Sequence, residues 1–204
     1  MSPLTFVAIS GSLRRGSHNT GLLRALLRLA PPDVAIDHFE DLGALPHFDQ
    51  DLEDRPPAAV ADLRRRVREA DGVIIATPEY NSSIPGVLMN ALDWLSRPAH
   101  DPSLRAKPVA VLGASPSQFG TARAQLVLRQ VLHRIQAPVV AHPEVTVFRS
   151  HGRFDADGAL TCDETTEGLL RDLLSGLIHL AAPTSTPSRA HAPGSRPRSV
   201  QVQA

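Results

Sequence analysis

The stretch Gly72–Thr77 reads GVIIAT, a run of strand length in which apolar residues do not alternate with polar ones. Two similar runs occur, LTFVAIS at Leu4–Ser10 and PVAVLG at Pro108–Gly113. Strands that are apolar on both faces are typical of parallel sheets covered by helices on each side. Each run is followed by a loop and then by a segment of helical periodicity, so the three runs predict the central strands of an α/β fold.

The segments around these runs complete the pattern. Val34–Phe39 alternates apolar and polar residues and predicts a fourth strand, and Val139–Phe148 predicts a fifth. The predicted helices are Asn19–Leu29, Pro57–Ala70, Pro85–Ser96, Gly120–Ile135 and Glu164–Ala181. Because crossover connections are right-handed, few topologies fit. The best match is a flavodoxin-like, doubly wound five-stranded parallel sheet of order 2-1-3-4-5 with helices on both faces.

The chain divides into one domain and a tail. It has 204 residues, of which 42% are hydrophobic, as expected of a chain that buries one core. Residues 1–182 form the predicted domain. Residues 183–204 are rich in Pro, Ser and Arg and lack apolar periodicity, so they predict a disordered basic tail. A weak docking arm is the alternative interpretation of the tail.

Charge and composition exclude several classes of protein. Lys and Arg number 21, as do Asp and Glu, so the chain lacks the basic surplus that binding to nucleic acid requires. The single cysteine, Cys162, permits no internal disulfide, and we expect its thiol to be inert. The nine histidines show no metal-ligand spacing, so no metal is expected. No apolar run reaches the ~20 residues that span a bilayer, and no signal peptide is recognised, so we expect a cytoplasmic protein without membrane contact.

The loop after the first strand, residues 11–20, reads GSLRRGSHNT and leads into a helix. Hydroxyl, amide and guanidinium groups beside helix N–H groups are typical of a phosphate site. The candidate phosphate ligands are Ser12, Arg14, Ser17, Asn19 and Thr20. The pattern matches neither GxGxxG nor GxxxxGK[ST], which disfavours a Rossmann dinucleotide site and a P-loop. A long turn capped by Ser17 or Asn19 is the alternative.

The other two central strands also end in informative loops. Residues 77–85 read TPEYNSSIP and hold the only tyrosine, Tyr80, whose ring beside Asn81 suits a planar heterocycle. Residues 113–121 read GASPSQFGT, where small side chains let a ligand approach the backbone. Either loop alone fits an ordinary turn. Ligands in doubly wound sheets bind at the carboxyl ends of the strands, so the coincidence of the three loops there favours a binding site.

Taken in order, these motifs resemble the NAD(P)H-dependent FMN reductase family, which includes quinone, azo-dye and chromate reductases. The resemblance rests on GSLR…S…N from Gly11, PEYN…PG…NA…DW…SRP from Pro78, and GASP…G…RAQ…LR from Gly113, and it excludes the tail. It implies that Ser12, Arg14, Ser17 and Asn19 hold the FMN phosphate. It further implies that Pro78, Glu79, Tyr80 and Asn81 hold the isoalloxazine, with Ser115 near its other edge. Two departures, Met89 in place of a frequent lysine and Ser117 in place of a frequent glycine, concern the nicotinamide site and the choice of acceptor.

The resemblance implies an oxidoreductase that passes hydride from NADPH or NADH to FMN and on to a quinone-like or other small-molecule acceptor, in alternating ping-pong steps. FMN carries this chemistry, so no catalytic side chain is expected. The alternatives are a flavodoxin-type electron carrier, which the neutral charge disfavours, and a non-catalytic FMN-binding module that regulates a partner.

We also expect a homodimer or homotetramer. The helix Pro85–Ser96 carries Val87, Leu88, Met89, Leu92, Trp94 and Leu95, which cover more of its circumference than one core-facing stripe needs. The family resemblance points the same way.

Overall fold

The computed structural model contains a parallel five-stranded sheet of order β2-β1-β3-β4-β5, which confirms the predicted topology. It describes residues 3–161 and 164–182. Cys162 and the tail at residues 183–204 lie outside the described residues. The strands are β1 (Leu4–Ser10), β2 (Val34–Phe39), β3 (Gly72–Ala76), β4 (Val109–Ala114) and β5 (Val145–Val147). The helices are α1 (His18–Leu29), α2 (Ala58–Glu69), α3 (Gly86–Leu95), α4 (Ala122–Ile135) and α5 (Glu164–Ala181), with short 3-10 turns at Asp41–Ala44 (η1), Gln50–Leu52 (η2) and Ser150–Gly152 (η3).

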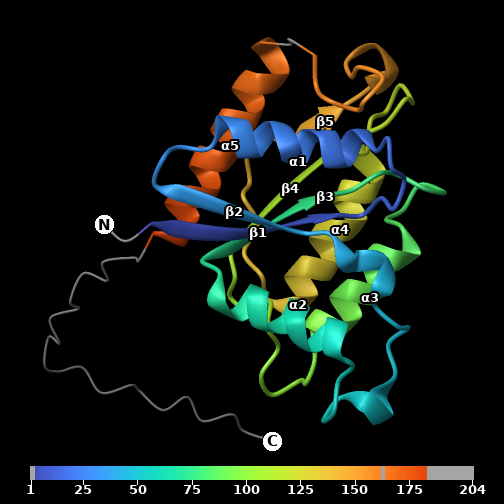
Figure 1. Cartoon of the computed structure of the whole chain (residues 1–204), viewed down its shortest axis with the longest axis vertical. Helices are drawn as coiled ribbons and strands as arrows, with labels where there is room; N and C mark the ends of the chain where they lie inside the picture. The colour runs from blue at the N-terminus through green and yellow to red at the C-terminus, as the bar shows by residue number, and fades with distance from the viewer. Residues whose placement is uncertain (1–2, 162–163, 183–204) are drawn as a thin grey trace, which may run out of the picture.

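The sheet separates two apolar cores, because successive side chains of each strand point to opposite faces. On β1, Phe6 and Ala8 pack with α1 and α5, whereas Val7 and Ile9 pack with α2, α3 and α4. Figure 1 shows α1 and α5 on one side of the strands and α2 and α3 on the other. Because both faces of the central strands are covered, β3 is buried along its whole length.

Strand β5 is shorter than the prediction for Val139–Phe148. Near Val139 the chain forms only an isolated bridge to β4, and the regular strand begins at Val145. Pro143, which lies between this bridge and β5, has no backbone N–H to donate to a neighbouring strand, which explains why the ladder does not run through this segment.

One face of helix α3 is buried within its own chain, whereas Val87 and Met89 are only partly buried. Trp94 is fully buried, its Nε1 donates to the carbonyl of Pro46 at 2.9 Å, and its ring meets Phe48 edge-on. Leu88, Leu92 and Leu95 belong to the same core. The expectation that α3 presents a second apolar face to a partner is therefore wrong for these side chains, since η1, α2 and the segment after η1 cover them.

No helix in the described ranges is long and apolar enough to cross a membrane.

Candidate functional site

The three loops expected to bind a ligand meet at the carboxyl edge of the sheet. The N–H of Gly11 donates to the carbonyl of Ala76 at 2.8 Å, which joins the end of β1 to the end of β3. A Cβ on Gly11 would lie 3.3 Å from Pro78 and 3.2 Å from Leu88, so the loops after β1 and β3 are in close contact. Asn19 joins the first loop to β4. The convergence predicted from the sequence is thus present.

The loop after β1 presents donors suited to a phosphate. Ser17 is the N-cap of α1, and its Oγ accepts from the N–H of Thr20 at 3.3 Å. In the described part of the chain, the N–H groups of His18 and Asn19 have no acceptor, as expected for the first turn of a helix. Arg14 is exposed beside them. These groups supply the positive potential and free donors that a phosphate dianion requires.

The side chains of two predicted phosphate ligands, Asn19 and Thr20, form hydrogen bonds to strands of the sheet. Asn19 is buried, and its amide donates to the carbonyl of Ala114 at 3.0 Å and accepts from the Ala114 N–H at 2.9 Å. Thr20 Oγ1 donates to Ser10 Oγ at 2.9 Å. Both side chains hold α1 against the sheet, and direct contact of either with a phosphate stays a prediction.

The loop after β3 is a tight hairpin. Tyr80 and Ser83 exchange backbone hydrogen bonds of 3.0 and 2.9 Å across Asn81 and Ser82. Both central residues have positive φ, 51° and 61°, as in a type I′ turn. Tyr80 stands at the base of this hairpin with 52% of its surface exposed. A rigid hairpin with an exposed aromatic ring offers a wall on which a planar ligand can lie.

Glu79 has a role that sequence reasoning missed. Its carboxylate accepts from the backbone N–H groups of Arg123 and Ala124 at 3.0 and 3.1 Å, which caps the N-terminus of α4. It also forms an ion pair with the Arg123 guanidinium, including a 2.7 Å bond from Nε. The Glu79 side chain is only 4% exposed. Its carboxylate therefore fixes the loop after β3 to α4, and its backbone is the part left for a ligand.

The loop after β4 is anchored to the last strand. Ser115 N–H donates to Val147 at 3.0 Å, and Ser115 accepts from the N–H of Ser150 at 3.1 Å. Its Oγ accepts from the N–H of Ser117 at 3.2 Å. The buried Ser115 thus sits where β4, β5 and η3 meet, and Asn19 reaches the neighbouring Ala114 from the other side.

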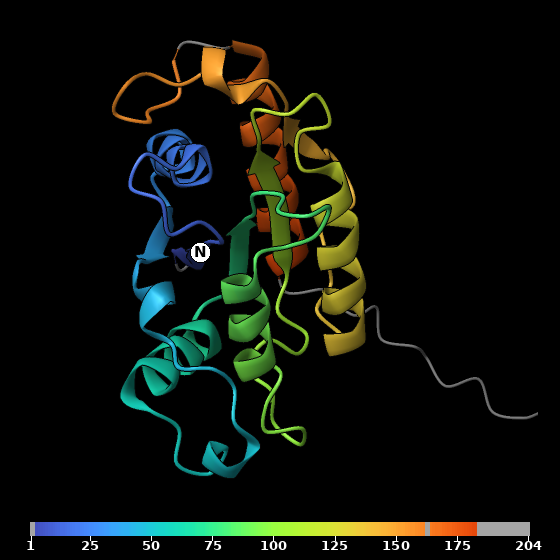
Figure 2. The ribbon, with the colours of Figure 1, turned by 90° about the vertical axis from the view of Figure 1, so that its right-hand side faces the viewer.

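The segment between β5 and α5 covers the start of α1, which sequence reasoning also missed. The Phe154 ring stacks on His18 with centroids 4.5 Å apart, and His18 Nδ1 lies 2.8 Å from Ser150 Oγ. Figure 2 shows this segment, in orange, reaching over the start of α1, in blue. A Cβ on Gly21 would lie 2.2 Å from the carbonyl oxygen of Gly158. A glycine inside a helix is unfavourable by itself, so Gly21 was the signal for this close approach.

Burial lowers the pKa of His18, and the charges of Arg14 and His151 lower it further. Both burial and the neighbouring positive charge of Arg14 thus disfavour a proton on the His18 imidazole.

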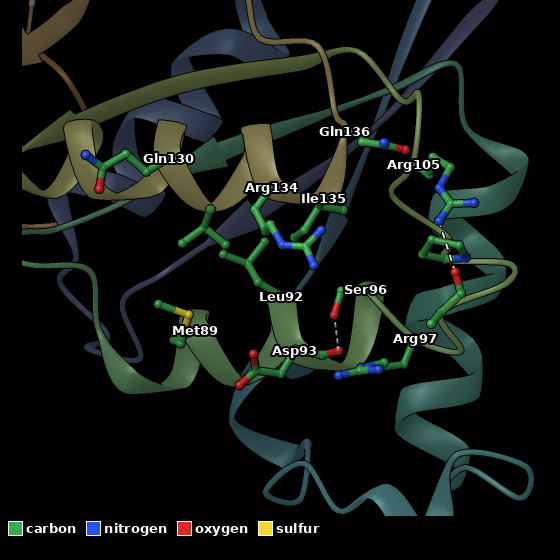
Figure 3. A pocket seen from close by; sticks show the side chains of 13 residues that line it. Met89, Leu92, Asp93, Ser96, Arg97, Arg105, Gln130, Arg134, Ile135 and Gln136 are labelled. Carbon is green, nitrogen blue, oxygen red and sulfur yellow. Dashed lines mark hydrogen bonds between the residues drawn. The ribbon is translucent and has the colours of Figure 1, made fainter. Parts of the chain in front are cut away.

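A large cavity lies elsewhere, between α3 and α4. It measures about 690 Å³ and is lined by apolar side chains such as Leu92 and Ile135 together with Asp93, Arg97 and Arg134. Figure 3 shows these charged side chains around the opening. No residue of the three loops lines it, so its size does not make it the ligand site. In residues 3–161 and 164–182, no group of three or more His, Cys, Asp or Glu side chains could hold a metal ion.

Comparison with known proteins agrees with this geometry. Residues 4–152 match the family model described as NADPH-dependent FMN reductase. An NAD(P)H-dependent FMN reductase of Pseudomonas aeruginosa is 42% identical over 168 residues, which are 82% of this chain and 90% of that protein. A 2-hydroxy-1,4-benzoquinone reductase of a Burkholderia species is 40% identical over 166 residues, 81% of this chain and 90% of that protein. The solved structure of a flavoenzyme NAD(P)H:(acceptor) oxidoreductase from Paracoccus denitrificans superposes with a TM-score of 0.78 at 34% identity, covering 87% of this chain and 97% of that one.

Proposed function

The chain belongs to the NADPH-dependent FMN reductase family, and we propose from this membership how its loops bind FMN and which acceptors it reduces. The enzyme is an NAD(P)H-dependent FMN and quinone reductase. The observation that carries the site assignment is the convergence of the loops after β1, β3 and β4 at one edge of the sheet.

The donors at the start of α1 fit the FMN phosphate. Two free N–H groups, the hydroxyls of Ser12 and Ser17, and the guanidinium of Arg14 together offer hydrogen bonds and positive charge to a dianion. Asn19 and Thr20 contribute by holding α1 and the end of β1 in place.

The flavin ring is proposed to lie against the backbone of Pro78, Glu79 and Asn81 and beside Tyr80, with Ser115 near its other edge. In the described residues, the N–H groups of Glu79 and Asn81 have no acceptor, so they can donate to the polar edge of the ring system. The Glu79–Arg123 cap holds this backbone still, and a fixed donor needs no rearrangement when the ligand binds.

FMN, when bound, supplies the chemistry by taking hydride from the nicotinamide and delivering it to the acceptor. The protein's residues bind and orient the two reactants at one exposed face, which Tyr80 borders. Because both reactants use this face, we propose that they bind in turn, with parallel double-reciprocal plots as the kinetic signature. The acceptor class we propose is small quinones, in keeping with the benzoquinone reductase relative.

Steady-state oxidation of NADPH with 1,4-benzoquinone and saturating FMN tests the assignment. Tyr80→Ala should lower kcat/KM by about 10-fold or more, because loss of the ring removes a wall that orients the nicotinamide. Leu180→Ala, a truncation of an exposed side chain on the last turn of α5, is the control and should leave the rate unchanged. If Tyr80→Ala kept the wild-type kinetics, Tyr80 would not be part of the site.

Assembly and location are further parts of the proposal. We propose a homodimer or homotetramer, as the sequence resemblance implied, and expect light scattering to give a mass of two or four times 21.9 kDa. A monomer at micromolar concentration would contradict this. We place the activity in the cytoplasm, because it consumes reduced nicotinamide, which cells hold internally.

A further inference from the structure

A second cavity, of about 300 Å³, lies beside the phosphate-binding loop on the side that faces β2. Its lining comes from the loop after β1, from Thr20 and Arg24 on α1, and from the end of β2 with η1. No residue of the loops after β3 and β4 lines it. The cavity therefore adjoins the proposed FMN site at the phosphate end and is separate from the place proposed for the flavin ring.

The cavity carries unbalanced positive charge. Arg14, Arg15 and Arg24 all line it, and in the described residues none of them belongs to an ion pair. The one carboxylate in the lining is that of Glu40, which is 80% exposed and lies 3.5 Å from His38. Three guanidinium groups around a small cavity attract an anion with two charges and several acceptor oxygens, such as a phosphate monoester.

One FMN phosphate does not account for all three arginines. Arg24 lies six residues beyond the start of α1, which places its backbone roughly 9 Å along the helix from the free N–H groups. Arg14 and Arg24 also have different neighbours. The charge of Arg14 lowers the pKa of His18 at the helix start, whereas the charge of Arg24 lowers the pKa of His38 on β2. Arg14 is assigned above to the FMN phosphate, although it also lines this cavity, so Arg15 and Arg24 remain for a second anion.

We propose that Arg15 and Arg24 bind the 2′-phosphate of NADPH in this cavity and so make the enzyme prefer NADPH over NADH. The inference rests on the proposed function, because the dinucleotide must first place its nicotinamide at the flavin. The 2′-phosphate is the only group that distinguishes the two donors, and it is a phosphate monoester. A volume of about 300 Å³ suits this phosphate and its ribose rather than a whole dinucleotide. Leu13, 59% exposed at the rim, offers apolar surface to the adenosine.

The test measures kcat/KM for NADPH and for NADH in the double variant Arg15→Gln/Arg24→Gln. The control is Arg28→Gln, which removes an exposed arginine one turn further along α1. The double variant should lose about 10-fold to 100-fold in kcat/KM for NADPH, with the NADH value and the FMN dissociation constant unchanged. Calorimetry on the FMN-loaded protein gives a readout without turnover. Adenosine 2′,5′-bisphosphate should bind more weakly to the double variant by a similar factor, while 5′-AMP should bind equally to both proteins.

Three outcomes would overturn the inference. Equal losses for NADPH and NADH would mean that the arginines act on the shared part of the dinucleotide. Weaker FMN binding would assign them to the flavin phosphate. If adenosine 2′,5′-bisphosphate bound the double variant as tightly as the wild type, the two arginines would not bind the 2′-phosphate. Absence of turnover with either donor in the wild type would contradict the proposed function instead, and the calorimetric result would still decide the site.

Discussion

Arg14 shows how one exposed side chain on the loop after β1 can be assigned to a part of the ligand. Charge-assisted hydrogen bonds to phosphate contribute roughly 1.5–3 kcal/mol each, so Arg14→Ala should weaken FMN binding by about 10-fold to 100-fold. Riboflavin lacks the phosphate, so its affinity should hardly change. Fluorescence-quenching titrations with both flavins measure this. Equal losses for the two would show that Arg14 does not contact the phosphate.

The lowered pKa values of two histidines let us predict how the stability of the protein depends on pH. Burial is the main cause that lowers the pKa of both His18 and His38 in the folded chain. As the pH falls through about 6.5, the unfolded chain binds protons at these positions before the folded chain does. The free energy of unfolding should therefore decrease from pH 7.5 toward pH 5.5.

Replacing one of the two histidines tests whether they cause this loss of stability at low pH. His18→Asn should flatten the dependence of the melting temperature on pH between 7.5 and 5.5. His47→Asn, at an exposed histidine, is the matched control and should keep the wild-type slope. An identical slope in His18→Asn would assign the acid sensitivity to other groups.

At the residue scale, the sequence predicts local roles better than distant ones. Ser17 was one of two candidate N-caps, and the structure confirms it, because a cap depends only on the following turn. The bonds of Asn19 to Ala114 and of Glu79 to α4 join positions 95 and about 44 residues apart, so local patterns could not reveal them. The sequence motifs predicted both residues as ligand contacts, although their side chains also join distant parts of the fold.

The elements follow the sequence where periodicity is strong. The three apolar runs became β1, β3 and β4, with bounds that differ from the prediction by at most one residue. The prediction was wrong for most of the segment before β5, where Pro143 interrupts the pairing, and for Leu88, Leu92, Trp94 and Leu95 on α3, which the chain itself covers. Apolar periodicity identifies a buried face, but it does not say whether the cover comes from the same chain.

Helix α4 offers a test of how the loop after β3 is held. Glu79→Ala should lower the free energy of unfolding by about 2–3 kcal/mol, because it leaves two N–H groups of α4 uncapped and removes the partner of Arg123. Arg123→Ala should cost only about 1 kcal/mol, since its side chain is 49% exposed and the buried carboxylate keeps both backbone donors. Urea denaturation of the two variants measures the difference. Equal losses would show that the ion pair, and not the cap, is the main contribution of Glu79.

At the scale of the whole molecule, the order of the strands was predictable because chirality and burial leave few alternatives. The segment between β5 and α5 was not, because it has neither strand nor helix periodicity and is placed by single contacts such as those of Phe154 with His18 and Gly158 with Gly21. The sequence thus predicted the strands that form the carboxyl edge of the sheet, but not the segment that covers the start of α1 there.

The division into a domain at residues 1–182 and a tail at residues 183–204 predicts that the tail can be removed. The site described above is built entirely from residues before α5, and the tail lacks the apolar side chains needed to pack on it. Deletion of residues 183–204 should therefore leave the NADPH–quinone rate, the FMN affinity and the mass in solution unchanged. Steady-state kinetics, flavin titration and light scattering on the truncated and full chains check the three quantities. A loss of activity together with a change in mass would place the tail in the assembly, whereas a loss of activity at constant mass would make it part of the site.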